Sequence, residues 1–119
     1  MEVKFIEHKG NKILYVDYRG AKNDSDLFKV LEKDVEIEKT LTEKSLLLAN
    51  FENTFLSYRY MEEVKKSGKE IRRKIMKKTA LVGITGLKVI MLKSYIQFTG
   101  QKNMKTFRTE EEALEWLIS

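Results

Sequence analysis

Hydrophobic and charged residues alternate at the start of the chain, where Val3 and Phe5 stand between charged positions. Residues 9–11 (Lys-Gly-Asn) then form a turn signal, and a second apolar run occupies residues 12–18. A period of two on both sides of a glycine-containing turn is typical of a β-hairpin. We therefore predict that the chain begins with two antiparallel strands.

The hydrophobic spacing changes to three and four residues after the acidic stretch 23–26, whose side chains suit a helix start. This spacing predicts a first helix that runs to about Lys39. Residues 45–50 are almost continuously apolar, as expected for a central strand covered on both faces. Ser57 then suits the N-cap of a second helix. The apolar stripe of that helix contains Met61, Val64, Gly68, Ile71 and Ile75.

A strand and a helix follow each other twice more in the second half of the chain. Residues 79–85 are expected to form a buried strand, and residues 87–98 a helix that Gly100 ends. A short strand is expected at residues 104–108. Thr109, followed three residues later by Glu112, has the pattern of a capping box for a last helix.

The predicted order is ββαβαβαβα, which indicates an α/β protein. Strands joined through helices pair in parallel by right-handed crossovers, and the opening hairpin adds an antiparallel edge strand. We therefore predict a five-stranded, mostly parallel mixed sheet with four helices. No repeat or linker interrupts residues 1–119, so we expect a single domain.

Composition excludes several classes of function. The chain has no cysteine and a single histidine, His8, so thiol catalysis, zinc–thiolate clusters and sites with two histidines are excluded. We expect neither a metal nor a cofactor. The beginning of the chain lacks the pattern of a secretory signal, and no apolar run approaches the roughly 20 residues of a membrane span. A soluble, cytoplasmic protein is the expectation.

Paired carboxylates are the remaining side chains that could act as a general acid and base. Asp17, Asp24 and Glu52 are candidates for one edge of the sheet, but nothing in their spacing requires them to meet. Acidic residues near helix starts are also expected simply as caps. We therefore predict that the protein is not an enzyme.

The element order, the segment 79–86 (Thr-Ala-Leu-Val-Gly-Ile-Thr-Gly) and the closing segment 105–117 together resemble bacterial proteins of the STAS-like class. That class includes the sporulation anti-sigma-factor antagonists and a looser group related to lipid-binding CRAL-TRIO domains. The resemblance covers nearly the whole chain and implies a module that regulates or binds a protein partner. In the sporulation antagonists, a serine after the central strand is phosphorylated within an Asp-Ser-Ser/Thr-Gly type of motif.

The corresponding segment here, residues 50–57, has no such motif, and neither Thr54 nor Ser57 is followed by glycine. Phosphorylation of that kind is therefore not expected. The leading hypothesis is protein binding through this loop, with Asn53, Thr54 and Ser57, and through the helix that follows it.

Residues 83–86 (Gly-Ile-Thr-Gly) join a predicted strand to a helix, and two interpretations are open. Backbone amides at a helix start, with Thr85, Gly86 and Lys88 beside them, would suit an anion. Alternatively the glycines allow a tight turn and Thr85 caps the helix, and we favour this interpretation.

The helix 87–98 has more apolar surface than one face of a sheet needs. It is compatible with a homodimer interface, a groove for a partner helix or the wall of a pocket for a small apolar or lipid-like ligand. Cover by neighbouring helices is an equally good explanation. The ligand-carrier hypothesis predicts a cavity lined by Leu87, Met91, Tyr95 and Phe98.

Residues 65–78 contain eight basic residues and one acidic residue, whereas the net charge of the chain is only +5. Such a cluster is compatible with nucleic acid or an anionic surface. The aromatic residues, however, occupy core-like positions and do not alternate with the charges. We therefore interpret the cluster as the solvated face of a helix and expect only weak nucleic-acid binding. Its candidate contact residues are Lys65, Lys69, Arg72 and Arg73.

Overall fold

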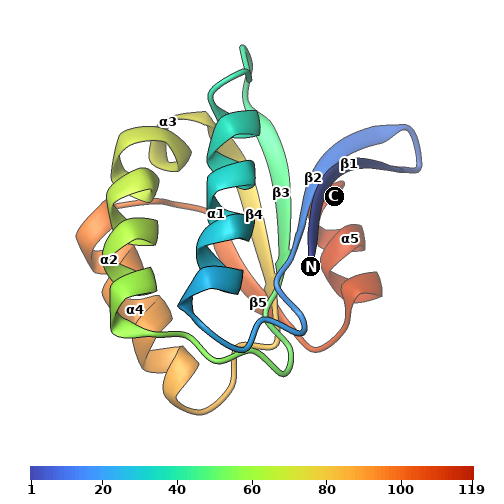
Figure 1. Cartoon of the computed structure of the whole chain (residues 1–119). Helices are drawn as coiled ribbons and strands as arrows, with labels where there is room; N and C mark the ends of the chain where they lie inside the picture. The colour runs from blue at the N-terminus through green and yellow to red at the C-terminus, as the bar shows by residue number, and fades with distance from the viewer.

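The computed structural model describes residues 1–119. Its centre is a five-stranded sheet with helices on both faces. In chain order the elements are β1 (Glu2–His8), β2 (Asn11–Asp17), α1 (Asp24–Glu38), β3 (Ser45–Asn50), α2 (Tyr58–Ser67), α3 (Arg73–Ile75), β4 (Met76–Val82), α4 (Leu87–Thr99), β5 (Met104–Phe107) and α5 (Glu110–Leu117). Helices α1, α2 and α4 cover one face of the sheet and α5 covers the other (Figure 1).

The strands lie in the order β1-β2-β3-β4-β5. The pair β1–β2 is antiparallel, and the other three pairs are parallel. This confirms the predicted mixed sheet with four helices, its antiparallel edge and its central strand at residues 45–50. Helix α1 has 15 residues, and none of the helices combines the length and apolar character needed to cross a membrane.

Alternate side chains of the central strands enter two separate cores. Leu47 and Ala49 of β3 face α1, α2 and α4, and belong to the larger cluster of buried residues. Leu48 faces α5 and packs with Ala113 and Leu117. This division explains why the strand is continuously apolar, since a strand with helices on both faces has no solvent side.

The second helix has the predicted length but is less regular than its spacing predicts. A π-helical segment, Gly68–Arg72, joins α2 to α3 without a break. A π turn takes about one residue more than an α turn, so the side chains after it are rotated relative to a regular helix. Arg72, which is expected on the solvated face with the other basic residues, instead lies one turn after Gly68 of the apolar stripe, points into the protein and is only 4% exposed.

The strand expected at residues 79–85 is found three residues earlier, at Met76–Val82. Its beginning was hidden because the helical stripe and the basic cluster continue to its first residues. Its end is decided by Gly83, whose φ of 85° takes the backbone out of the extended conformation. The remaining elements agree with prediction to within about two residues, including the Thr109 cap of α5.

Gly68 permits a close approach, but to Tyr95 of α4 and not to the sheet. A Cβ at this position would overlap the phenol ring of Tyr95. We therefore expect Gly68→Ala to lower the free energy of unfolding by about 1–3 kcal/mol through overpacking. Helix propensity alone would have the opposite sign, a gain of about 1 kcal/mol.

Urea denaturation measures this effect, and Lys66→Ala, at an exposed position of α2, is the matched control. A Gly68→Ala protein as stable as the wild type, or more stable, would show that the contact with Tyr95 is not tight.

Candidate functional site

Two loops meet at the edge of the sheet where the parallel strands end, residues 51–57 after β3 and residues 83–86 after β4. The ammonium group of Lys88 donates a hydrogen bond to the carbonyl of Phe51 over 2.7 Å. Gly83 allows the loops to touch, because a Cβ there would meet the backbone of the first loop. Segments far apart in the sequence therefore form one continuous surface.

Hydrogen bonds fix the backbone of the loop after β3. The hydroxyl of Thr54 is buried and donates to the carbonyl of Tyr18 over 3.1 Å. The hydroxyl of Ser57 accepts from the backbone N–H of Tyr60 over 3.1 Å, which is the predicted N-cap of α2. The loop is thus held at its middle and at its end.

Two large aromatic side chains project from this fixed backbone into solvent. Phe55 is 63% exposed and Tyr58 is 78% exposed. Their neighbours Leu56 and Tyr60 are buried, so the chain alternates between anchoring side chains and free ones. Two exposed rings three residues apart on an ordered segment form an apolar patch, and such a patch marks a candidate contact surface.

A polar hollow lies beside the two loops, over the ends of β4 and β5. Asn53, Thr85 and Lys88 all line it. Lys88 is directed at the Phe51 carbonyl, and partial burial lowers the pKa of its ammonium group. Gly86 occupies the N-cap of α4, and no side chain caps that helix. The other charged residues of the hollow are Glu52, Lys105, Arg108 and Glu112.

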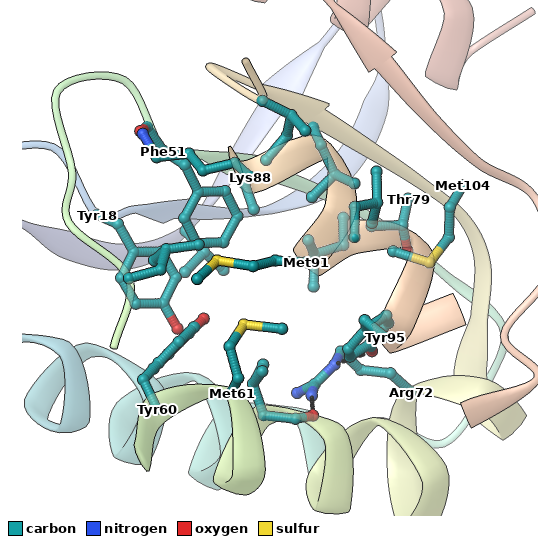
Figure 2. A pocket seen from close by; sticks show the side chains of 18 of the residues that line it. Tyr18, Phe51, Tyr60, Met61, Arg72, Thr79, Lys88, Met91, Tyr95 and Met104 are labelled. Carbon is teal, nitrogen blue, oxygen red and sulfur yellow. Dashed lines mark hydrogen bonds between the residues drawn. The ribbon is translucent and has the colours of Figure 1, made fainter. Parts of the chain in front are cut away.

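An internal cavity of about 80 Å³ lies between the sheet and the helices α2 and α4 (Figure 2). Fifteen of its 19 lining residues are hydrophobic. Met61 and Met91 point into the space from the two helices, and Tyr18 and Phe51 close it on the loop side (Figure 2). Lys88 lines both this cavity and the polar hollow, so it lies where the two adjoin.

A buried ionic cluster forms the polar end of the cavity. The guanidinium group of Arg72 contacts Glu38 Oε1 at 2.9 Å and Asp34 Oδ2 at 3.7 Å. It also donates to the hydroxyl of Tyr95 over 3.0 Å. One cation therefore faces two carboxyl groups. Asp34 Oδ1, Glu38 Oε2 and the Tyr60 hydroxyl are buried without a hydrogen-bond partner.

The pKa values of the two carboxyl groups are both displaced upward. Burial, reinforced by the charge of Glu38, raises the pKa of Asp34 well above its usual value in spite of Arg72. Burial also raises the pKa of Glu38, and Arg72 opposes that shift. Arg72 lies closer to Glu38 than to Asp34. We therefore assign the ionised form to Glu38 and the protonated form to Asp34.

The three carboxylates considered for catalysis each have a separate partner. Asp17 accepts a hydrogen bond from Arg19 over 3.0 Å, and this bond keeps its pKa low although burial alone would raise it. Asp24 lies 3.9 Å from an arginine of α2, and Glu52 accepts from the side chain of Asn50. No group of three potential metal-binding side chains occurs in the structure.

Comparisons with known proteins concern the fold. No protein-family model and no curated protein sequence matches the chain. A solved structure from Shewanella loihica PV-4, an uncharacterized protein of the DUF3478 family with a SpoIIAA-like fold, superimposes with a TM-score of 0.71 at 17% identity, covering 98% of this chain and 92% of that one. An anti-sigma-factor antagonist (STAS) domain protein from Planctomyces limnophilus gives 0.60 at 12% identity, covering 98% of each chain.

The chain has a STAS-like fold. The resemblance expected from the sequence is thereby confirmed at the level of architecture. At identities of 17% and 12%, this likeness concerns the fold.

Within this STAS-like fold the predicted site residues separate into three groups. Asn53, Thr54 and Ser57 lie in the loop after β3, where the hydroxyl of Thr54 is buried and already engaged. Lys88 contacts that loop through the Phe51 carbonyl, and Thr85 and Gly86 precede it at the start of α4. Inside the helical layer, Met91 and Tyr95 line the cavity.

The predictions for four residues are wrong. Leu87 and Phe98 do not line the cavity, because they lie on the outer side of α4 and are 66% and 51% exposed. Thr85 does not cap α4, since Gly86 occupies the N-cap. Arg72 does not belong to the basic surface, because it points into the protein and is only 4% exposed.

Sequence reasoning missed the two exposed aromatic residues and the buried acids. Phe55 and Tyr58 are exposed, contrary to the expectation that the aromatic residues occupy core-like positions. Phe55 and the buried Leu56 are neighbours in a loop, where no hydrophobic period indicates which side chain is buried. Asp34 does lie on the apolar stripe of α1, one residue before Val35, and Glu38 follows it four residues later. Acids at such positions were the available signal for a buried ion pair.

The pH dependence of stability tests the assignment of the proton to Asp34. Because its pKa is raised in the folded state, the folded protein keeps a proton that the unfolded chain loses above about pH 4. Stability should therefore fall as the pH rises through this window, by at most about 1.4 kcal/mol per pH unit. Asp34→Asn cannot ionise and should decline less.

Urea denaturation from pH 4.5 to 8 measures both proteins, with Glu36→Gln, at an exposed position of α1, as the control. Parallel profiles for the wild type and Asp34→Asn would refute the assignment.

Proposed function

We propose that this STAS-like protein is a non-catalytic module that binds a protein partner through the loop 51–57 and the first turn of α2. The observation that carries the proposal is the exposure of Phe55 and Tyr58 on a backbone that Thr54 and Ser57 hold in place. We call this region the partner surface and define it by Asn53, Phe55, Ser57 and Tyr58.

The physics of interfaces supports this choice. Aromatic side chains contribute a large share of binding free energy at interfaces, because they bury much area at a small cost in side-chain entropy. The loop backbone is already ordered, so binding would not have to order it. Asn53, with a φ of 51°, gives the loop its sharp turn just before the first ring.

Replacing both rings tests the partner surface. Phe55→Ser combined with Tyr58→Ser should leave the fold intact, because both side chains are largely exposed, and should weaken partner binding by roughly tenfold or more. Phe5→Ser, at a half-exposed position on β1, removes a ring from another surface and serves as the matched control.

Quantitative affinity capture from the native cells compares the three proteins. The proposal requires a protein that the wild type and the Phe5 variant retain and the double variant loses. If every captured protein is retained equally by all three, the partner surface does not bind it and the proposal fails.

A second candidate, carriage of a small apolar ligand, is favoured by the cavity alone. A cavity of about 80 Å³ is smaller than the roughly 150 Å³ that accommodates benzene in an engineered protein core. A lipid chain would therefore require the helices to move apart. Met61, Met91 and Met104 line the cavity, and the flexibility of methionine would allow some widening.

Native mass spectrometry before and after organic extraction tests this candidate. Bound ligand would appear as an added mass that extraction removes. Ala49→Val, which adds two methyl groups at the cavity wall, should reduce the loaded fraction. Bare protein in every sample would exclude the ligand.

A further inference from the structure

The outer side of α4 exposes large apolar side chains along its whole length. Leu87 is 66% exposed, Ile90 64% and Phe98 51%. A helix of 13 residues is about 20 Å long, so these side chains mark both ends of the helix. α4 contains no acidic residue. The exposed side of α4 therefore combines large apolar side chains with Lys93 and Gln97, and has no negative charge.

Three cations from the neighbouring helix lie along the same side of α4. The ammonium group of Lys65 donates to the hydroxyl of Ser94 over 2.6 Å. The ammonium group of Lys69 lies 5.2 Å from the centre of the Phe98 ring. The side chain of Arg73 passes beside Gly100, the residue that ends the helix. The cations thus follow α4 from its middle to its end.

No carboxylate neutralises these cations. None of the three lies within 4.0 Å of an Asp or Glu oxygen, whereas the buried Arg72 nearby has two such neighbours. Glu63 and Glu70 line a groove against α1 on another side of the second helix. Glu62, one turn before Lys65, forms no ion pair within 4.0 Å. An aromatic ring also lies among these cations, because Phe98 is in contact with Lys69. The sequence pattern predicts instead that the aromatic residues and the basic cluster are separate.

We propose that this face binds the anionic headgroup surface of a phospholipid bilayer. We call it the α4 face and define it by Lys65, Lys69, Arg73, Leu87, Ile90 and Phe98. Exposed apolar side chains on a helix can enter the headgroup boundary while flanking cations contact lipid phosphates. Neither feature alone gives firm attachment, so the combination of apolar and cationic contacts supports a reversible association.

The shape of the α4 face favours a bilayer over the other occupants. A partner helix docks in an apolar groove, but Leu87, Ile90 and Phe98 line neither the internal cavity nor the polar hollow nor the groove against α1. Nucleic acid would use the cations but would leave Leu87 and Ile90 without a role. A bilayer uses both kinds of side chain.

Flotation with phosphatidylcholine vesicles, with and without phosphatidylglycerol, tests the proposal. At about 0.15 M salt we expect binding only to the vesicles that contain phosphatidylglycerol, and release at high salt. Lys65→Gln, Lys69→Gln and Arg73→Gln together should weaken binding on the order of 100-fold, at about fivefold for each cation. The same number of changes at the exposed Lys33, Lys39 and Lys44 is the matched control and should have a much smaller effect.

Two further variants separate the alternatives. Leu87→Ser with Ile90→Ser should weaken binding roughly tenfold without a change in charge. The partner-surface variant, Phe55→Ser with Tyr58→Ser, should bind vesicles like the wild type, so this proposal and the proposed function can fail independently.

Several results would overturn the proposal: no binding to anionic vesicles, equal binding to neutral ones, or an equal loss in the charge control. Binding that persists after Leu87 and Ile90 are changed would reduce the α4 face to a general attraction for anions, such as duplex DNA. Sedimentation that shows a dimer abolished by the same two changes would assign the face to a second copy of the chain.

Discussion

The helical layer depends on one buried guanidinium group. Arg72 comes from the π-helical segment after α2 and contacts Glu38 at the end of α1 and Tyr95 of α4. Tyr95 in turn donates to Gln101, whose amide donates to Thr79 of β4. An unpaired charge at this depth would cost several kcal/mol, so the three helices and the sheet must meet in this arrangement.

The position of this cluster explains why the layer has a cavity. Polar partners with defined geometry hold the helices together beside Arg72, whereas flexible methionine side chains fill the space toward the loops. Packing of that kind leaves small voids, and the orphaned hydroxyl of Tyr60 lies at the same junction.

Two outer faces differ in what they offer a partner. The loop after β3 presents rigid aromatic rings with little charge, which suits a protein surface. The α4 face presents aliphatic side chains bordered by unpaired cations, which suits an anionic layer. Both faces depend on the interior, because the contact of Gly68 with Tyr95 sets the approach of the second helix to α4.

Local signals determined the order and type of the elements. The opening hairpin, the doubly covered strand at residues 45–50 and the Thr109 cap depend on neighbours a few residues away, so periodicity and capping rules predict them. The meeting of the loops after β3 and β4 is a consequence of this order, since parallel strands end at the same edge of a sheet.

Only the tertiary structure decided which members of the basic and aromatic sets are buried. Arg72 is buried because Glu38, 34 residues earlier in the chain, lies opposite it and accepts a hydrogen bond from its guanidinium group. Phe98 is exposed because no element covers the outer side of α4. Burial depends on what another element places against a side chain, and the residues next to it in the sequence do not carry that information.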